Sequence, residues 1–257
     1  MTRIAATVVM LLVPLAAPDA VELPAATPST VALVDSMRQA GFSDGFELRM
    51  NITTVSPIGH RSQLIKAAVI GQFGPDRQRL TIRGISPEQV RNRSLIAERS
   101  NDARIKVIEY GVQSGDGNPY GNLFDSGIVL WDMFSPWWDW PKQQLRGRDR
   151  LAGHDCTVIS SQSDADNSPI REVVSCVDPD TKLSLRTQLF DSRHALIRTI
   201  SVGQVIRKQS GYGAAKRLSI VSADNSLTEV EVYGGDEHYA ITAATFAPLD
   251  SQSSIGR

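Results

Sequence analysis

The strongest constraint on the fold is an alternation of apolar and polar residues that begins near Phe46 and recurs along the rest of the chain. Phe46, Leu48, Met50 and Ile52 are separated by polar or charged residues. One face of this segment is therefore apolar, which is typical of a half-buried β-strand. The segments of this kind that we expect to be strands lie near 46–53, 61–73, 77–83, 93–100, 104–110, 142–151, 154–162, 170–177, 183–191, 194–206, 215–222 and 226–233.

This spacing predicts a mainly β fold with a few helices. About eleven or twelve strands joined by hairpin turns form a meandering antiparallel sheet, and we expect it to be a large curved sheet or incomplete barrel. One helix is expected over 30–40, where Ser29 or Thr30 can cap it and Gly41 ends it. A second, shorter helix is expected over 124–134 and would end before Pro136.

An aromatic segment over 130–141 contains all of the tryptophans in the chain. Clustered indole rings bury a large apolar area. The segment is therefore a core plug that closes one end of the barrel, or its surface lines an apolar ligand cavity. The two alternatives overlap, because a plug can also be a lid. The aromatic and apolar side chains concerned are Trp131, Met133, Phe134, Trp137, Trp138 and Trp140.

The first residues have the pattern of an export signal. A basic residue, Arg3, precedes an apolar stretch and then small residues, so residues 1–20 are predicted to be a signal peptide with its cleavage site between 17 and 26. The alternative is a retained membrane anchor. Residues 21–28 are expected to form a flexible arm, 29–250 a single domain, and 251–257 a disordered tail.

The two cysteines, Cys156 and Cys176, lie on the two arms of one expected hairpin, and they would be directly opposite each other if the loop were centred near Asp166. An even cysteine count in an exported chain favours a disulfide. The alternative is a pair of buried free thiols.

Composition and motifs give little support for nucleic-acid binding, metal binding or catalysis. The net charge of −1 argues against nucleic acid as the main partner. No phosphate loop, dinucleotide fingerprint or nucleophile elbow is present, and no two histidines have metal-ligand spacing. We therefore expect no cofactor, no metal and no enzyme activity. A remote alternative is a hydrolase that uses Asp132, Asp139 or His154.

Several segments resemble one known family. The first similar block consists of Leu123–Gly127, Trp131–Phe134 and Trp138–Pro141. It precedes a stretch over 145–159 that is similar to a glycine- and cysteine-containing hairpin of that family. The strand–turn–strand over 177–191 and the closing Phe246-Ala-Pro are also similar. The chain resembles the outer-membrane lipoprotein-sorting proteins of the LolA-like superfamily over roughly residues 30–250.

This resemblance implies a half-closed antiparallel barrel, plugged by helices on its concave face, whose cavity shelters acyl chains without bond chemistry. It implies a periplasmic carrier of lipidated protein or lipid, with membrane-bound donor or receptor proteins as partners. The tryptophan-rich insert departs from the family pattern and leaves the cargo open. An envelope sensor or interaction module with a self-filled barrel is the alternative. Besides the aromatic segment, the residues expected to line the cavity are Phe46, Leu48 and Met50.

Overall fold

The structure, a computed structural model, describes residues 29–249 apart from 101–103, 112–116, 166–167 and 209–210. The predicted signal peptide 1–20, the arm 21–28 and the tail 251–257 lie outside the described residues, and the boundaries of the domain over 29–250 stay a prediction. Among the helices of the described part, none combines the length and the apolar character needed to span a membrane.

The described residues form twelve strands with short helices beside or between them. The expected strands are all present, with ends that shift by a few residues. In chain order the elements are α1 (Thr30–Ala40), β1 (Ser43–Val55), β2 (Ile65–Phe73), β3 (Arg77–Ser86), α2 (Glu88–Arg91), β4 (Ser94–Ser100), β5 (Ile105–Tyr110), η1 (Leu123–Asp125), α3 (Leu130–Phe134), η2 (Pro136–Asp139), β6 (Lys142–Leu151), β7 (His154–Gln162), β8 (Glu172–Asp178), β9 (Leu183–Phe190), β10 (Leu196–Arg207), β11 (Gly213–Ser222) and β12 (Leu227–Asp236).

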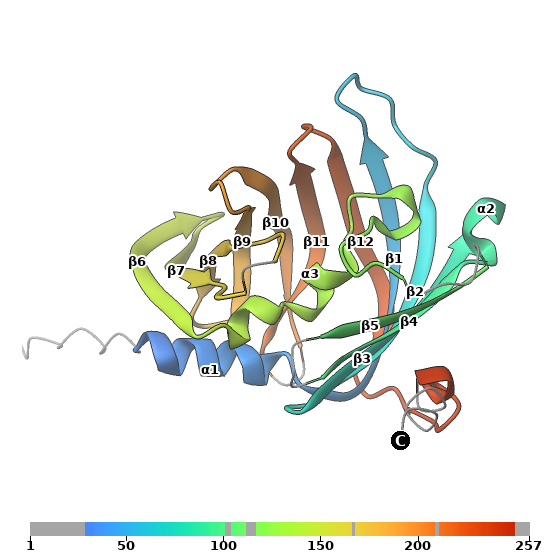
Figure 1. The fold of residues 1–257 in the computed structure, drawn as a ribbon, viewed down its shortest axis with the longest axis horizontal. Helices are drawn as coiled ribbons and strands as arrows, with labels where there is room; N and C mark the ends of the chain where they lie inside the picture. Colours follow the sequence, from blue (N-terminus) through green and yellow to red (C-terminus); the bar gives the residue numbers. More distant parts are fainter. Residues whose placement is uncertain (1–28, 101–103, 112–116, 166–167, 209–210, 250–257) are drawn as a thin grey trace, which may run out of the picture.

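All twelve strands belong to one sheet in the order β5-β4-β3-β2-β1-β12-β11-β10-β9-β8-β7-β6. Each neighbouring pair is antiparallel, and β5 and β6 are the free edges. The sheet curls without closing, and α1 and α3 lie on its concave side (Figure 1). The predicted fold class, an incomplete antiparallel barrel plugged by helices, is confirmed.

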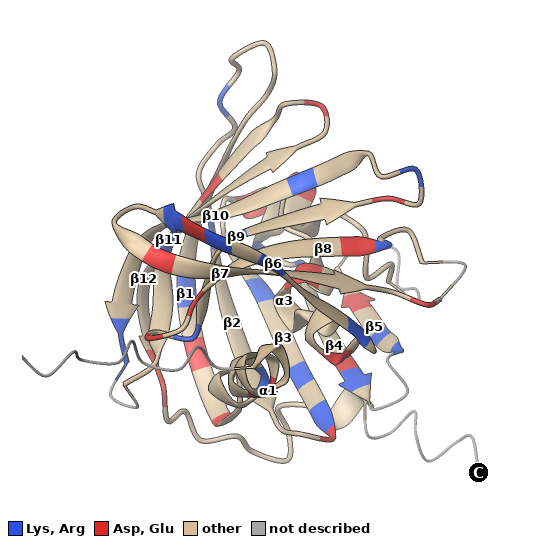
Figure 2. Ribbon diagram, turned by 90° about the vertical axis from the view of Figure 1, so that its left-hand side faces the viewer, with Lys and Arg blue, Asp and Glu red and all other residues tan. Residues whose placement is uncertain are grey.

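The strand order determines where the aromatic segment runs. β5 and β6 are consecutive in sequence but lie at opposite edges of the sheet, so residues 111–141 have to connect the two edges. Figure 1 shows this connection crossing the concave side with α3 in the middle. At the β6 end the connection meets α1, which contacts both β6 and η2. Basic and acidic positions are interspersed along the strands (Figure 2).

Two apolar clusters result from this crossing. One joins β1–β5 and β11–β12 to Leu123, Phe124 and Phe134 of the crossing connection. The other joins α1 to β7–β9 through Trp131, Trp137 and the rest of the tryptophan cluster. The connection therefore contributes to the core on both halves of the sheet.

The helix predictions have different outcomes. The helix over 30–40 is confirmed: Ser29 caps it by accepting a hydrogen bond from the Ala32 amide at 3.2 Å, and Gly41 follows its end. The continuous helix over 124–134 is wrong. Phe124 and Asp125 have positive φ angles of 52° and 58°, so the chain turns out of a helical path before α3 begins at Leu130. The apolar spacing of this segment reflects burial on two sides rather than one helix face.

A disulfide joins Cys156 on β7 to Cys176 on β8, with 5.4 Å between the two Cα atoms. The predicted bond is confirmed, but the predicted register is wrong. Cys176 lies opposite Val158, so the two cysteines occupy diagonal positions on one face rather than directly opposite ones. The connecting loop is centred one residue later than expected.

We expect removal of this disulfide to lower the free energy of unfolding by about 3 kcal/mol, because the bond closes a loop with a sequence separation of 20 residues. The variant carries both Cys156→Ala and Cys176→Ala, and the measurement is denaturant-induced unfolding. Reductant should destabilise the wild-type protein by a similar amount and leave the double variant unchanged. Equal unfolding midpoints for the oxidised wild type and the double variant would contradict the prediction.

Candidate ligand-binding cavity

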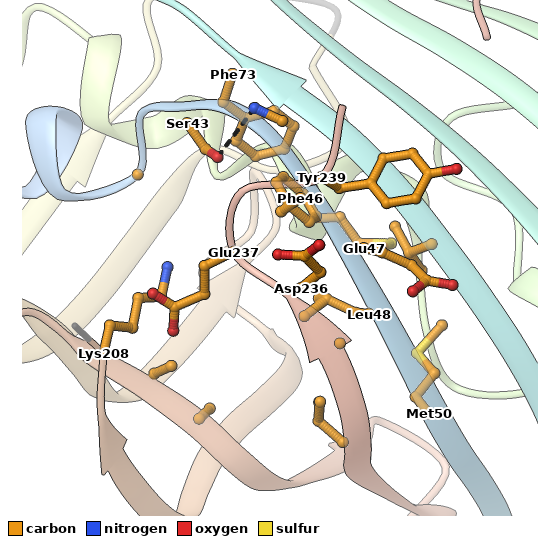
Figure 3. A pocket seen from close by; sticks show the side chains of 18 of the residues that line it. Ser43, Phe46, Glu47, Leu48, Met50, Phe73, Lys208, Asp236, Glu237 and Tyr239 are labelled. Carbon is orange, nitrogen blue, oxygen red and sulfur yellow. Dashed lines mark hydrogen bonds between the residues drawn. The ribbon is translucent and has the colours of Figure 1, made fainter. Parts of the chain in front are cut away.

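A cavity of about 1540 Å³ lies between the crossing connection and the middle of the sheet. Its walls come from β1, β2 and β10–β12, from residues 128–135 of the connection, and from the chain at 40–45 and 236–241. Figure 3 shows one region of it, where β1 contributes Phe46, Leu48 and Met50 to the wall. The cavity therefore occupies the part of the concave side over β1, β2 and β10–β12, which the tryptophans leave uncovered.

The cavity reaches the surface where β11 and β12 separate. Their pairing ends at Arg217 opposite Glu231, although β11 begins at Gly213 and β12 continues to Asp236. The last part of β12 remains paired with β1 as far as Glu47. Residues of both separated strand ends line the cavity, so this divergence of the sheet forms its mouth.

The apolar wall on β1 depends on a glycine of the neighbouring strand. Phe46 pairs with Gly71 on β2, and a Cβ atom at Gly71 would lie only 2.3 Å from the Phe46 ring. The glycine thus allows Phe46 to lie across β2, where it meets Phe73 edge to face with 5.4 Å between the ring centroids. Phe73 and Met133 also line the cavity.

The predicted site residues fall into three groups. Phe46, Leu48, Met50 and Met133 line the cavity. Phe134 lies behind the wall, stacked on Phe73 with 5.9 Å between the ring centroids. The tryptophans lie on the other half of the concave side: Trp131, Trp137 and Trp138 are buried against α1 and β7–β9, and Trp140 is half-buried beside them.

The cavity also has lining residues that the sequence analysis did not single out. They come mainly from β10–β12 and include Ile200, Leu218, Ile220 and Val230. Their alternation with polar residues was visible, but it is the same alternation that every strand of the sheet shows. Only the strand order, which brings β12 beside β1, reveals that these faces meet the face of Phe46.

Asp132 forms a buried ion pair in the cavity wall. Its Oδ1 accepts a hydrogen bond from Nη2 of Arg198 on β10 at 3.0 Å. Its Oδ2 lies 2.9 Å from Nε of the same guanidinium, and both side chains are about nine-tenths buried. Burial raises the pKa of the Asp132 carboxyl from 3.8 to about 6, although the Arg198 guanidinium acts in the opposite direction. The pair fastens α3 to the sheet beside the cavity.

Asp139 is held by two arginines from different elements. Its Oδ1 lies 2.9 Å from Nε of Arg38 on α1, and its Oδ2 lies 2.6 Å from Nη2 of Arg99 on β4. Asp132 and Asp139 therefore each act as partners of arginine, which gives the hydrolase alternative no support. His154 is paired with Asp178, 3.1 Å from Nδ1 to Oδ2, and does not line the cavity. The described residues contain no cluster of acidic, histidine and cysteine side chains that could hold a metal.

No protein-family model matches the sequence, and no curated protein is significantly similar to it. Solved structures do share its fold. A putative outer membrane lipoprotein-sorting protein domain from Vibrio parahaemolyticus has a TM-score of 0.76 at 13% identity, covering 84% of this chain and 96% of the other. A DUF1329 family protein from Desulfovibrio piger has a TM-score of 0.75 at 15% identity, covering 84% and 95%.

A LolA superfamily protein from Nitrosomonas europaea has a TM-score of 0.68 at 11% identity, covering 86% of this chain and 98% of the other. The class of protein that the comparisons define is one of fold: this chain shares the open antiparallel barrel of these solved structures, one of them a LolA superfamily protein. The resemblance predicted from the sequence is confirmed at the level of the fold.

The Asp132 carboxyl should make stability depend on pH. Its pKa is higher in the folded protein than in the unfolded chain, so the folded state takes up a proton between pH 6 and pH 4. Its contribution to stability is therefore gained as the pH falls through this window and lost as the pH rises. A shift of this size corresponds to a free energy on the order of 3 kcal/mol.

The measurement is the free energy of unfolding of the wild type and of Asp132→Asn from about pH 4 to about pH 7.5. This range covers both protonation states of the Asp132 carboxyl. The variant should lack this gain at low pH, whatever constant offset the unpaired Arg198 adds. Asp155→Asn, at an exposed position, is the control and should follow the wild type. If the free energy of unfolding depended on pH in the same way for the wild type and for Asp132→Asn, the raised pKa of Asp132 would be contradicted.

Proposed function

We propose that the protein binds and carries acyl chains of lipoproteins, or another hydrophobic ligand, by non-covalent transfer between membranes of the bacterial envelope. The observation that carries this proposal is the cavity of about 1540 Å³ between the sheet and the crossing connection. A carrier role is supported by the fold, which is shared with a putative outer membrane lipoprotein-sorting protein domain. The predicted signal peptide fits a periplasmic location.

The energetics of an apolar cavity suit reversible carriage. Each methylene moved from water into the cavity contributes about 0.8 kcal/mol, so a chain that buries about ten methylenes gains about 8 kcal/mol. Loss of translational and rotational freedom offsets at least about 4 kcal/mol of this gain. One chain is then held weakly enough to leave again, which a carrier requires.

We assign the predicted site residues two roles. Phe46, Leu48, Met50 and Met133 contact the ligand, since their side chains line the cavity. The aromatic residues Trp131, Phe134, Trp137, Trp138 and Trp140 hold the connection that forms the opposite wall. The expected partners are a lipidated protein or lipid and membrane-bound donor or receptor proteins.

A second candidate function is an envelope sensor or interaction module whose barrel is filled by its own side chains. The tryptophan cluster favours it, because three buried indoles fill the concave side over β7–β9. In that case the remaining cavity would not take up a ligand. Binding of an apolar probe therefore distinguishes the two functions.

A tryptophan placed in the cavity should block binding. Val232 lines the cavity on β12, and Val221, 41% exposed on β11, does not. We expect Val232→Trp to lower the affinity for the neutral fluorescent probe N-phenyl-1-naphthylamine at least about tenfold, since the indole occupies space that the probe needs. Val221→Trp is the matched control and should bind as the wild type does.

Probe fluorescence measures the affinity, and circular dichroism checks that each variant is folded. If Val232→Trp does not fold, Ala214→Trp replaces it at another position in the wall. Transfer of a fluorescent acylated peptide between donor and acceptor vesicles then tests carriage. A wild-type protein that binds neither probe nor acylated peptide would overturn the carrier function and leave the self-filled module.

A further inference from the structure

A lysine lies in the apolar row of β11. The residues of β11 that line the cavity are Ala214, Ala215, Lys216, Leu218 and Ile220. The last three follow each other at the two-residue period of one strand face. On this face Lys216 takes a position where an apolar residue would continue the wall. Its side chain is half-buried, so its charge is only partly solvated.

The backbone at Lys216 is irregular. Across the pairing with β10, Arg217 lies opposite Gln204 and Ala215 lies opposite Val205, which leaves Lys216 as the extra residue of a β-bulge. Bulges re-aim a side chain and are frequent beside functional sites. The pairing of β11 with β12 also ends at Arg217, so Lys216 is the first residue beyond it, at the mouth of the cavity.

A second lysine lies at the same mouth. Lys208 directly follows β10, lines the cavity and is half-buried. Figure 3 shows its side chain among those that line the pocket. Among the described residues, neither Lys208 nor Lys216 has an ion pair or a side-chain hydrogen bond.

The other half-buried charges in the wall are already neutralised. Asp132 is paired with Arg198, and Glu47 accepts two hydrogen bonds from Arg49, at 3.1 and 3.2 Å. The remaining acidic residues of the lining are exposed at its rim: Asp44, Asp236 and Glu237. The charges that remain unmatched inside the rim are therefore the two lysines.

We propose that Lys208 and Lys216 bind the anionic head of the ligand whose acyl chain occupies the cavity. The head is a carboxylate or a phosphate, the two anions that lysine binds as a point charge. The methylene stems of the lysines lie along the apolar wall and keep the ammonium groups at the mouth. Attraction between half-buried charges is stronger than between exposed ones. This inference rests on the proposed function and names the class of its ligand.

The test compares ligands that share one chain and differ in the head: dodecanoate, dodecyl phosphate, dodecanol and dodecylamine. Each displaces N-phenyl-1-naphthylamine from the wild type and from the Lys208→Met, Lys216→Met double variant. We expect the wild type to prefer the anions over dodecanol, and the double variant to bind them about tenfold more weakly, with dodecanol unchanged. Salt should weaken binding of the anions only in the wild type. The ratio of the affinity for dodecyl phosphate to the affinity for dodecanoate shows whether the site prefers a phosphate head or a carboxylate head.

Lys66→Met is the matched control, because Lys66 is exposed on β2 and does not line the cavity. It should bind all of the ligands as the wild type does. Equal affinity for dodecanoate and dodecanol, with no effect of the double variant, would overturn the anion site and leave the carrier function standing. A preference for dodecylamine would also overturn it and would point to the acidic rim. A wild type that takes up none of the ligands would overturn both proposals.

Discussion

The concave face of an open curved sheet is apolar and has to be covered, and in this chain one connection packs on it together with α1. β5 and β6 are adjacent in sequence but lie at the two free edges, so the chain between them has to cross the whole sheet. It carries its tryptophans on the β6 side and Phe134 on the β5 side. The position of the core, of the polar ties and of the cavity all follow from this one crossing.

The two aspartates of the crossing connection fix its position rather than add much stability. Asp132 binds Arg198 on β10, and Asp139 joins Arg38 on α1 to Arg99 on β4. Desolvation offsets much of the Coulomb energy of buried pairs, and the raised pKa of Asp132 is a sign of that cost. Apolar contacts alone would allow the connection to shift along the sheet, whereas ion pairs to residues on separate strands specify one position for it. The pair at Asp132 therefore defines one wall of the cavity.

The two-residue alternation was sufficient to predict the strands, and the cap and end residues were sufficient to predict the helix α1, because these are local properties of the sequence. The number of strands and the hairpin turns between them indicated the open antiparallel sheet. The pairing of β1 with β12 joins segments far apart in the sequence, and no residue pattern in either strand predicts it. For this reason Phe46, Leu48 and Met50 were predicted as lining while Leu218 and Val230, which share the cavity, were not. Tryptophan content indicated burial of the aromatic segment, but only the path from β5 to β6 shows which half of the sheet it covers.

Under the proposed carrier function, separating the part of the concave side filled by tryptophans from the cavity reconciles two demands. A protein whose core formed only around its ligand would lose stability whenever it released the ligand, because binding and folding would be linked. Here Trp131, Trp137 and Trp138 pack on β7–β9 and are not among the residues that line the cavity. The free energy of ligand binding is then not needed for folding. The affinity can be set by the cavity and its mouth alone, and it can stay low enough for the ligand to be handed on.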